Sequence, residues 1–117
     1  MIIALTHIPS EQDADGKING EEINNLISKT KGLDAVLSAH SHLRVCGTIN
    51  NIPVVQAQCY GEKYGLLKIN VDDKIGKLLG IEPYVYDVPA TGEILPENTA
   101  GKILAKYEDI EKKYSEF

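Results

Sequence analysis

The first forty residues carry an apolar and polar pattern that predicts a strand, a helix and a second strand. Residues 1–5 form a continuous apolar run, which is typical of a strand covered on both faces. An exposed loop over residues 11–20 comes next, and residues 20–31 then place apolar side chains at helical spacing, with Asn19 as the capping residue. Residues 33–38 are again mostly apolar. This order predicts a βαβ unit with parallel strands and a right-handed crossover.

The rest of the pattern predicts antiparallel strands and a final helix. Four extended segments follow the βαβ unit, at residues 44–49, 52–57, 65–71 and 75–88. Asn50-Asn51 tolerates the positive φ of a hairpin turn, and Pro83 is expected to break the last strand. Residues 97–117 have the spacing of an amphipathic helix. We therefore expect an α/β (α+β) fold in two parts, with a βαβ unit and an antiparallel hairpin or meander over residues 1–96 and a C-terminal helix over residues 97–117.

The composition narrows the classes of protein. The 117 residues are 43% hydrophobic and 25% charged, which is the ordinary mixture of a folded domain. The net charge of −5 leaves no basic footprint, so we do not expect binding to a nucleic-acid duplex. Neither a membrane span nor a signal peptide is evident, and the chain as written is expected to be cytoplasmic.

All three histidines of the chain lie where a predicted strand ends. His7 follows the first strand, and His40 and His42 follow the second. Because the carboxyl ends of parallel strands meet at one edge of a sheet, and a His-x-His pair on an extended segment points to one side, we expect the three imidazoles to converge. Such a set suits a transition metal. Surface exposure or hydrogen bonding in the core is the alternative role of these residues.

Several motifs resemble those of calcineurin-like metallophosphoesterases, and more narrowly the 5′-nucleotidase and 2′,3′-cyclic-nucleotide phosphodiesterase branch. They are Thr6-His7 after an apolar strand, residues 33–42 ending in Ala39-His40-Ser41-His42, and Pro53-Val54-Val55-Gln56-Ala57 with Tyr60-Gly61 and Gly65. The resemblance covers about residues 1–88 and implies half of a β-sandwich flanked by helices. It also implies a hydrolase, with His7 and His40 binding one metal of a dinuclear pair and His42 the other, and with nucleotide phosphate esters as substrates.

Other ligand motifs of that family are missing from the chain. Asp-x-His, Gly-Asp and Gly-Asn-His-Asp/Glu, which lie upstream in the family, do not occur. We therefore expect a truncated domain that binds at most one divalent metal (Zn, Mn, Co or Ni) and has little or no activity alone. A nucleotide or phosphate ester becomes a substrate if an N-terminal half completes the domain. The resembled family is often exported.

Further expectations concern the same sheet edge. Gln56 and Tyr60 are possible substrate-proximal residues, although either can have a packing role instead. If the hairpin register extends far enough, Cys59 joins His40 and His42 in a zinc site. Half a sandwich leaves an apolar face and a strand edge open, so a homodimer or a complementing chain is expected. The alternative function is a non-catalytic metal-binding or partner-binding domain that dimerises.

Overall fold

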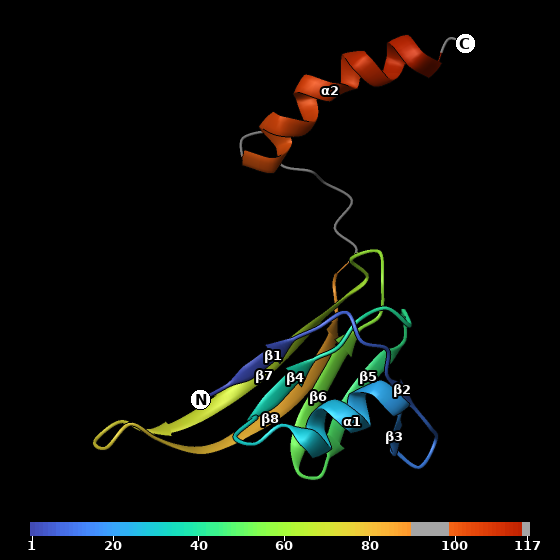
Figure 1. Cartoon of the computed structure of the whole chain (residues 1–117). Helices are drawn as coiled ribbons and strands as arrows, with labels where there is room; N and C mark the ends of the chain where they lie inside the picture. The colour runs from blue at the N-terminus through green and yellow to red at the C-terminus, as the bar shows by residue number, and fades with distance from the viewer. Residues whose placement is uncertain (90–98, 116–117) are drawn as a thin grey trace.

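The computed structural model describes residues 1–89 and 99–115 of the chain (Figure 1). In chain order, the elements are β1 (Ile3–Leu5), β2 (Glu11–Gln12), β3 (Ile18–Asn19), α1 (Glu21–Lys29), β4 (Ala35–Leu37), β5 (Arg44–Ile49), β6 (Ile52–Ala57), β7 (Lys63–Asp72), β8 (Lys77–Asp87) and α2 (Thr99–Ser115). No helix of the described residues is long and apolar enough to cross a membrane.

A four-stranded sheet with the order β1-β4-β6-β5 forms the centre of the fold. Strands β1, β4 and β6 run parallel, with Leu5 opposite Leu37, and β5 pairs with β6 in the antiparallel direction. The β5–β6 hairpin turns at Asn50 and Asn51, whose φ angles are +49° and +65°. The structure thus confirms the predicted βαβ unit and the predicted hairpin.

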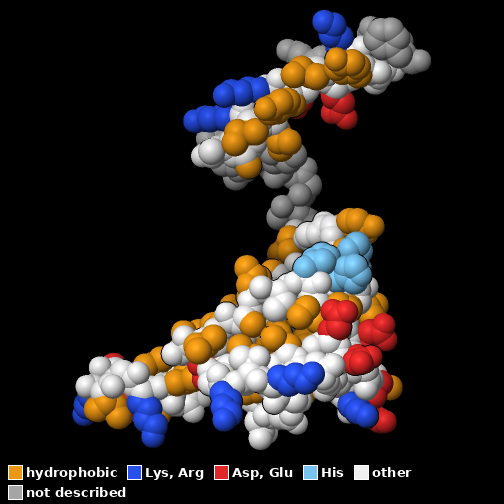
Figure 2. All heavy atoms as spheres, in the orientation of Figure 1, with side chains coloured by type: hydrophobic (Ala, Val, Ile, Leu, Met, Phe, Trp, Pro, Cys, Tyr) orange, Lys and Arg blue, Asp and Glu red, His pale blue; other side chains and the backbone are white. Residues whose placement is uncertain are grey.

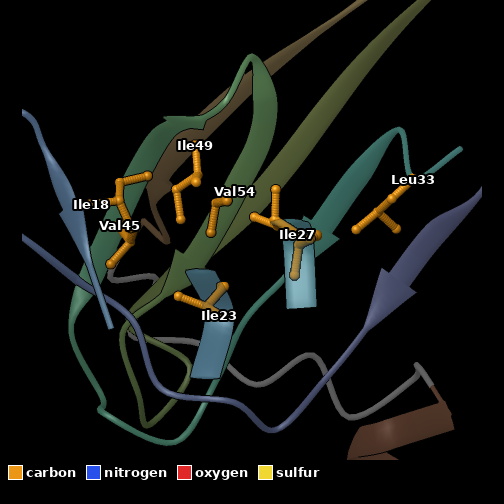
Figure 3. Packing of buried hydrophobic residues seen from close by; sticks show 8 residues of the cluster. Ile18, Ile23, Ile27, Leu33, Val45, Ile49 and Val54 are labelled. Atoms are coloured by element: carbon orange, nitrogen blue, oxygen red, sulfur yellow. The ribbon is translucent and has the colours of Figure 1, made fainter. Parts of the chain in front are cut away.

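Helix α1 covers one face of this sheet and closes the core. The apolar side chains of the core come from α1, from the strands and from the segments on either side of the helix (Figure 3): Ile18, Ile23, Ile27, Leu33, Val36, Val45, Ile49 and Val54. Each such side chain stabilises the fold by about 1.5–3 kcal/mol relative to an exposed one. This layer fixes where β1 and β4 end, and with them the histidine-bearing loops.

The β7–β8 hairpin packs on the opposite face, over β5 and β6. A Cβ atom built on Gly65 of β7 would lie only 2.5 Å from Cγ1 of Val55, which shows how closely the two sheets approach. The Cys46 thiol also donates a hydrogen bond to the Pro83 carbonyl, with an Sγ–O distance of 3.3 Å. Two sheet layers with a helix on one side form the half-sandwich that the resemblance implied.

Two expectations about the first twenty residues are wrong. Strand β1 is not covered on both faces, because it lies at the edge of the sheet and Leu5 is 83% exposed. The segment predicted as an exposed loop contains the small β2–β3 hairpin, in which Ile18 is buried in the core. One apolar residue among polar neighbours carries too weak a periodic signal to predict that hairpin.

The capping residue of α1 and the effect of Pro83 also differ from expectation. Gly20, with φ +140°, precedes the helix, and no side chain caps it, while Asn19 belongs to β3. Strand β8 runs through Pro83, which pairs with Leu67. A proline is tolerated there because β7 and β8 form a two-stranded sheet, so each strand has a free edge. The predicted final helix is confirmed over Thr99–Ser115, whereas the predicted boundary at residue 96 lies outside the described residues.

Candidate metal centre

His7 and His40 meet at the carboxyl edge of the central sheet. They follow the parallel strands β1 and β4, and the ladder continues past β1 because the Thr6 amide donates to the Leu37 carbonyl at 2.9 Å. The two imidazole rings have centroids 5.0 Å apart and an interplanar angle of 84°. Figure 2 shows the histidine side chains gathered at one end of the sheets. The parallel topology therefore brings together two side chains that are 33 positions apart in the sequence.

His42 lies in the loop that joins β4 to β5, and its ring faces Tyr60 at a centroid distance of 6.0 Å. His40 and His42 have φ angles of +83° and +59°, so both adopt the left-handed backbone that residues with a side chain rarely use. The expected extended His-x-His segment is therefore wrong, since β5 begins only at Arg44. Left-handed backbone of this kind is concentrated at ligand sites.

All three imidazoles are exposed, and none makes a hydrogen bond or an ion pair with the part of the chain that the structure describes. Their ring nitrogens are thus available to a ligand. Within residues 1–89 and 99–115, however, no group of three or more His, Cys, Asp or Glu side chains is arranged to hold a metal ion. The edge therefore offers imidazoles in a suitable place without a complete ligand set.

Cys59 does not join His40 and His42 in a metal-binding group among the described residues. The β5–β6 pairing ends at Arg44 and Ala57, and one more backbone hydrogen bond follows it, from the Gln58 amide to the Leu43 carbonyl. The register therefore ends before it would place Cys59 opposite His42. Gln58 and Tyr60 then turn the chain with φ angles of +62° and +59°. Both cysteines are free and half-buried.

Tyr60 and Gln56 occupy very different positions. Tyr60 is 86% exposed and lies beside His42. Gln56 is only 2% exposed and lies beneath the histidine-bearing loops, where its amide contacts other protein groups. The structure therefore places one of these two residues at the surface of the site and the other below it.

A buried network of polar side chains underlies the site, and the sequence reasoning missed it. Its members are Ser10, Ser38, Ser41 and Gln56. The Ser10 and Ser38 hydroxyl oxygens lie 2.6 Å apart, and the Ser38 hydroxyl donates to the Ile8 carbonyl at 2.8 Å. The position of Ser38 indicates such a network in the sequence. It lies two positions after the inward-facing Val36, so its polar side chain is expected on the buried face.

Two carboxyl groups of the β7–β8 hairpin, those of Glu82 and Asp87, have shifted pKa values. A hydrogen bond from Tyr84, together with the nearby Lys68, lowers the pKa of Glu82. Hydrogen bonding and charge from Lys63 lower the pKa of Asp87. These carboxyls are exposed and paired across the hairpin, so they support its ladder rather than a reaction.

The fold matches a solved structure from a known class of protein. A solved structure, the calcineurin-like phosphoesterase YfkN from Bacillus subtilis, superposes on 98% of this chain with a TM-score of 0.70 and 25% sequence identity, over 39% of its own length. In sequence and in fold, the chain thus resembles the C-terminal part of a calcineurin-like phosphoesterase domain, as its motifs predicted.

Two curated proteins of Bacillus subtilis (strain 168) are similar to this chain in sequence. Endonuclease YhcR is 32% identical over 110 residues, which cover 93% of this chain and 9% of that protein. Trifunctional nucleotide phosphoesterase protein YfkN is 32% identical over 90 residues, which cover 65% of this chain and 6% of that protein. No protein-family model matches the chain. The chain therefore spans less than a tenth of either curated relative.

Proposed function

We propose that this chain supplies the histidine side of a metal centre for the hydrolysis of nucleotide phosphate esters, in the manner of the 5′-nucleotidase branch. The observation that carries the proposal is the pair His7 and His40, whose rings lie 5.0 Å apart beyond two parallel strands. The name of the relative YfkN, a nucleotide phosphoesterase, supports this class of substrate.

The residues at the edge fit part of a transition-metal site. Neutral imidazole is a good ligand for Zn, Mn, Co or Ni, and His7 and His40 would hold one ion while His42 would face a second. A divalent ion held there would supply Lewis-acid chemistry, polarising a phosphoryl oxygen and lowering the pKa of a bound water molecule. The described residues bring no carboxylate into a cluster with these histidines, so repulsion between two ions is uncompensated and the chain holds one ion at most.

The missing ligands define the role of an upstream part of the domain. In our proposal, a polypeptide with Asp-x-His and Gly-Asn-His motifs completes the centre, either in the same chain or in another one. The chain alone then binds a metal but hydrolyses little substrate. Its His residues would contribute imidazole ligands, while the upstream polypeptide would contribute the carboxylate ligands.

Complementation tests this proposal. The chain alone, with Mn²⁺, should hydrolyse a chromogenic phosphate ester and nucleoside monophosphates at no more than the rate of the metal in buffer. When mixed with a polypeptide encoded directly upstream that carries the two missing motifs, it should gain hydrolysis, and His40→Ala should abolish that gain. Full activity of the isolated chain, or a gain that survives His40→Ala, would contradict the proposal.

The second candidate function is a non-catalytic partner-binding domain that dimerises. Apolar residues in the edge strand β1 and directly before it favour this candidate, because Met1, Ile2 and Leu5 are exposed. A second copy pairing along β1 would cover them. Light scattering at micromolar concentration should then give twice the mass of the chain, and Leu5→Lys should give a monomer, with the exposed Ile75→Lys as control. A monomeric wild-type protein would rule this candidate out.

A further inference from the structure

The hydrogen bonds of Gln56 converge on the loop that carries His40 and His42. The Gln56 amide nitrogen Nε2 donates to Oγ of Ser41 at 2.6 Å and to the carbonyl of Leu43 at 2.8 Å. Its oxygen Oε1 lies 3.3 Å from Oγ of Ser38. The contacted residues precede His40, separate the two histidines and follow His42.

The same network fixes this loop to the segment after β1, which bears His7. The Ser41 hydroxyl donates to the Ser10 carbonyl at 2.6 Å, and the Ala39 amide donates to the Ile8 carbonyl at 3.3 Å. The two hydrogen bonds of the Ser41 hydroxyl are compatible, because it accepts from Gln56 and donates to Ser10. Gln56 therefore connects the two histidine-bearing loops from below, at a position closed to solvent.

The left-handed backbone at His40 and His42 needs such support. A non-glycine residue keeps a positive φ only when the surrounding structure imposes it. The short backbone hydrogen bond from the Ser41 amide to the Ala39 carbonyl, at 3.2 Å, holds a tight turn but reaches neither β6 nor the β1 loop. Backbone hydrogen bonds join the two ends of the loop to β6 and its continuation, from the Ser38 amide to the Val55 carbonyl and from the Gln58 amide to the Leu43 carbonyl. The side chain of Gln56 adds a connection from β6 to Ser41, the residue between the two histidines.

We propose that Gln56 is a positioning residue, which holds the His40–His42 loop in its left-handed conformation and keeps His40 beside His7 before a metal binds. The inference deepens the proposed function and rests on it for the role of the metal. It assigns Gln56 to preorganisation of the ligands rather than to contact with substrate. Loss of its hydrogen bonds lets the loop sample other conformations. Metal binding then has to order the loop, and this entropic cost lowers the affinity.

Gln12 offers a matched control for Gln56. Its side chain also makes several hydrogen bonds to distant backbone, donating to the carbonyls of Gly16 and Cys46 at 2.9 and 3.0 Å and accepting from the Cys46 amide at 2.9 Å. It stabilises the β2–β3 hairpin against β5 without contacting any histidine-bearing loop. The Gln12→Met variant therefore measures the effect of losing glutamine side-chain hydrogen bonds that do not involve a histidine-bearing loop.

The experiment compares the full chain with its Gln56→Met, Ser41→Ala and Gln12→Met variants. Backbone NMR order parameters of residues 40–42 should fall from about 0.85 to below 0.6 in the first two variants and stay unchanged in Gln12→Met. The affinity for Co²⁺, measured by calorimetry, should fall about tenfold or more in Gln56→Met and Ser41→Ala and less than twofold in Gln12→Met. Ser41→Ala decides the question if Gln56→Met does not fold.

Unchanged order parameters in the variant that folds would overturn the inference, as would a loss in affinity that Gln12→Met shares. The two proposals fail separately. A wild-type chain that binds no Co²⁺ refutes the proposed function of the chain, whereas the order parameters of residues 40–42 still decide whether Gln56 holds the loop.

Discussion

At the scale of single residues, the site depends on backbone conformations that the side chains do not favour. His40 and His42 adopt positive φ, which costs about 1–3 kcal/mol for each residue. Buried hydrogen bonds from Gln56 to the residues around them offset this cost. The residues proposed to bind a metal, His40 and His42, thus differ from the residue proposed to position them, Gln56. Only the histidines are evident from the chemistry of their side chains.

The close approach of the two sheets predicts that a side chain added at Gly65 clashes, whereas one added at Gly80 does not. Gly65→Ala should lower the free energy of unfolding by about 1–3 kcal/mol, because its Cβ would lie 2.5 Å from Cγ1 of Val55 in a packed interface. Gly80→Ala, in the same hairpin, meets nothing within 4 Å and serves as the control. Urea unfolding measures both, and equal stabilities of the two variants would contradict the observed packing.

At the scale of elements, α1 is the helix that closes the core. Ile23 is fully buried between α1 and the sheet, so Ile23→Ala should lower the free energy of unfolding by about 2–5 kcal/mol. Ile75, in the turn between β7 and β8, is 71% exposed, and Ile75→Ala should change it by less than about 0.5 kcal/mol. A small effect at Ile23 would show that the helix does not pack as described.

The ion pair between Lys63 and Asp87 on the β7–β8 hairpin predicts that the free energy of unfolding depends on pH. Because Lys63 lowers the pKa of Asp87 below its ordinary value of 3.8, the pair stabilises the fold above that value, and this contribution is lost as the pH falls through the lowered pKa. Asp87→Asn should therefore be slightly less stable than wild type at pH 7 and equally stable in strong acid. The effect is small because Asp87 is exposed and salt screens it. Urea unfolding midpoints of both proteins, measured from pH 7 to strong acid, test this prediction. A difference between wild type and Asp87→Asn that persisted in strong acid would contradict it.

The sequence predicted the elements with regular patterns well. Parallel β1 and β4, the turn at Asn50-Asn51 and the final helix follow from periodicity and turn chemistry, and the juxtaposition of His7 and His40 follows from the βαβ topology. The β2–β3 hairpin could not be predicted because its strands are two residues long. The left-handed His40 and His42 could not be predicted either, since tertiary hydrogen bonds impose them.

At the scale of the whole molecule, the chain corresponds to a limited part of its relatives. It matches 39% of the solved phosphoesterase chain and less than a tenth of the two curated proteins. The sheet edge is consistent with a partial domain. Among the described residues it presents imidazoles but no complete set of metal ligands. The proposed metal centre, shared with another segment, would account for both findings.

The stoichiometry of metal binding tests this account most directly. Calorimetric titration of the full chain with Zn²⁺ should show one weak ion per chain, lost in His40→Ala. An exposed loop acid gives the control, Asp15→Asn, which should bind as wild type does. Lowering the pH should weaken binding, because protons compete for the imidazoles. Two tight sites per chain, or a site unaffected by His40→Ala, would contradict the claim that this chain carries only the histidine side of the centre.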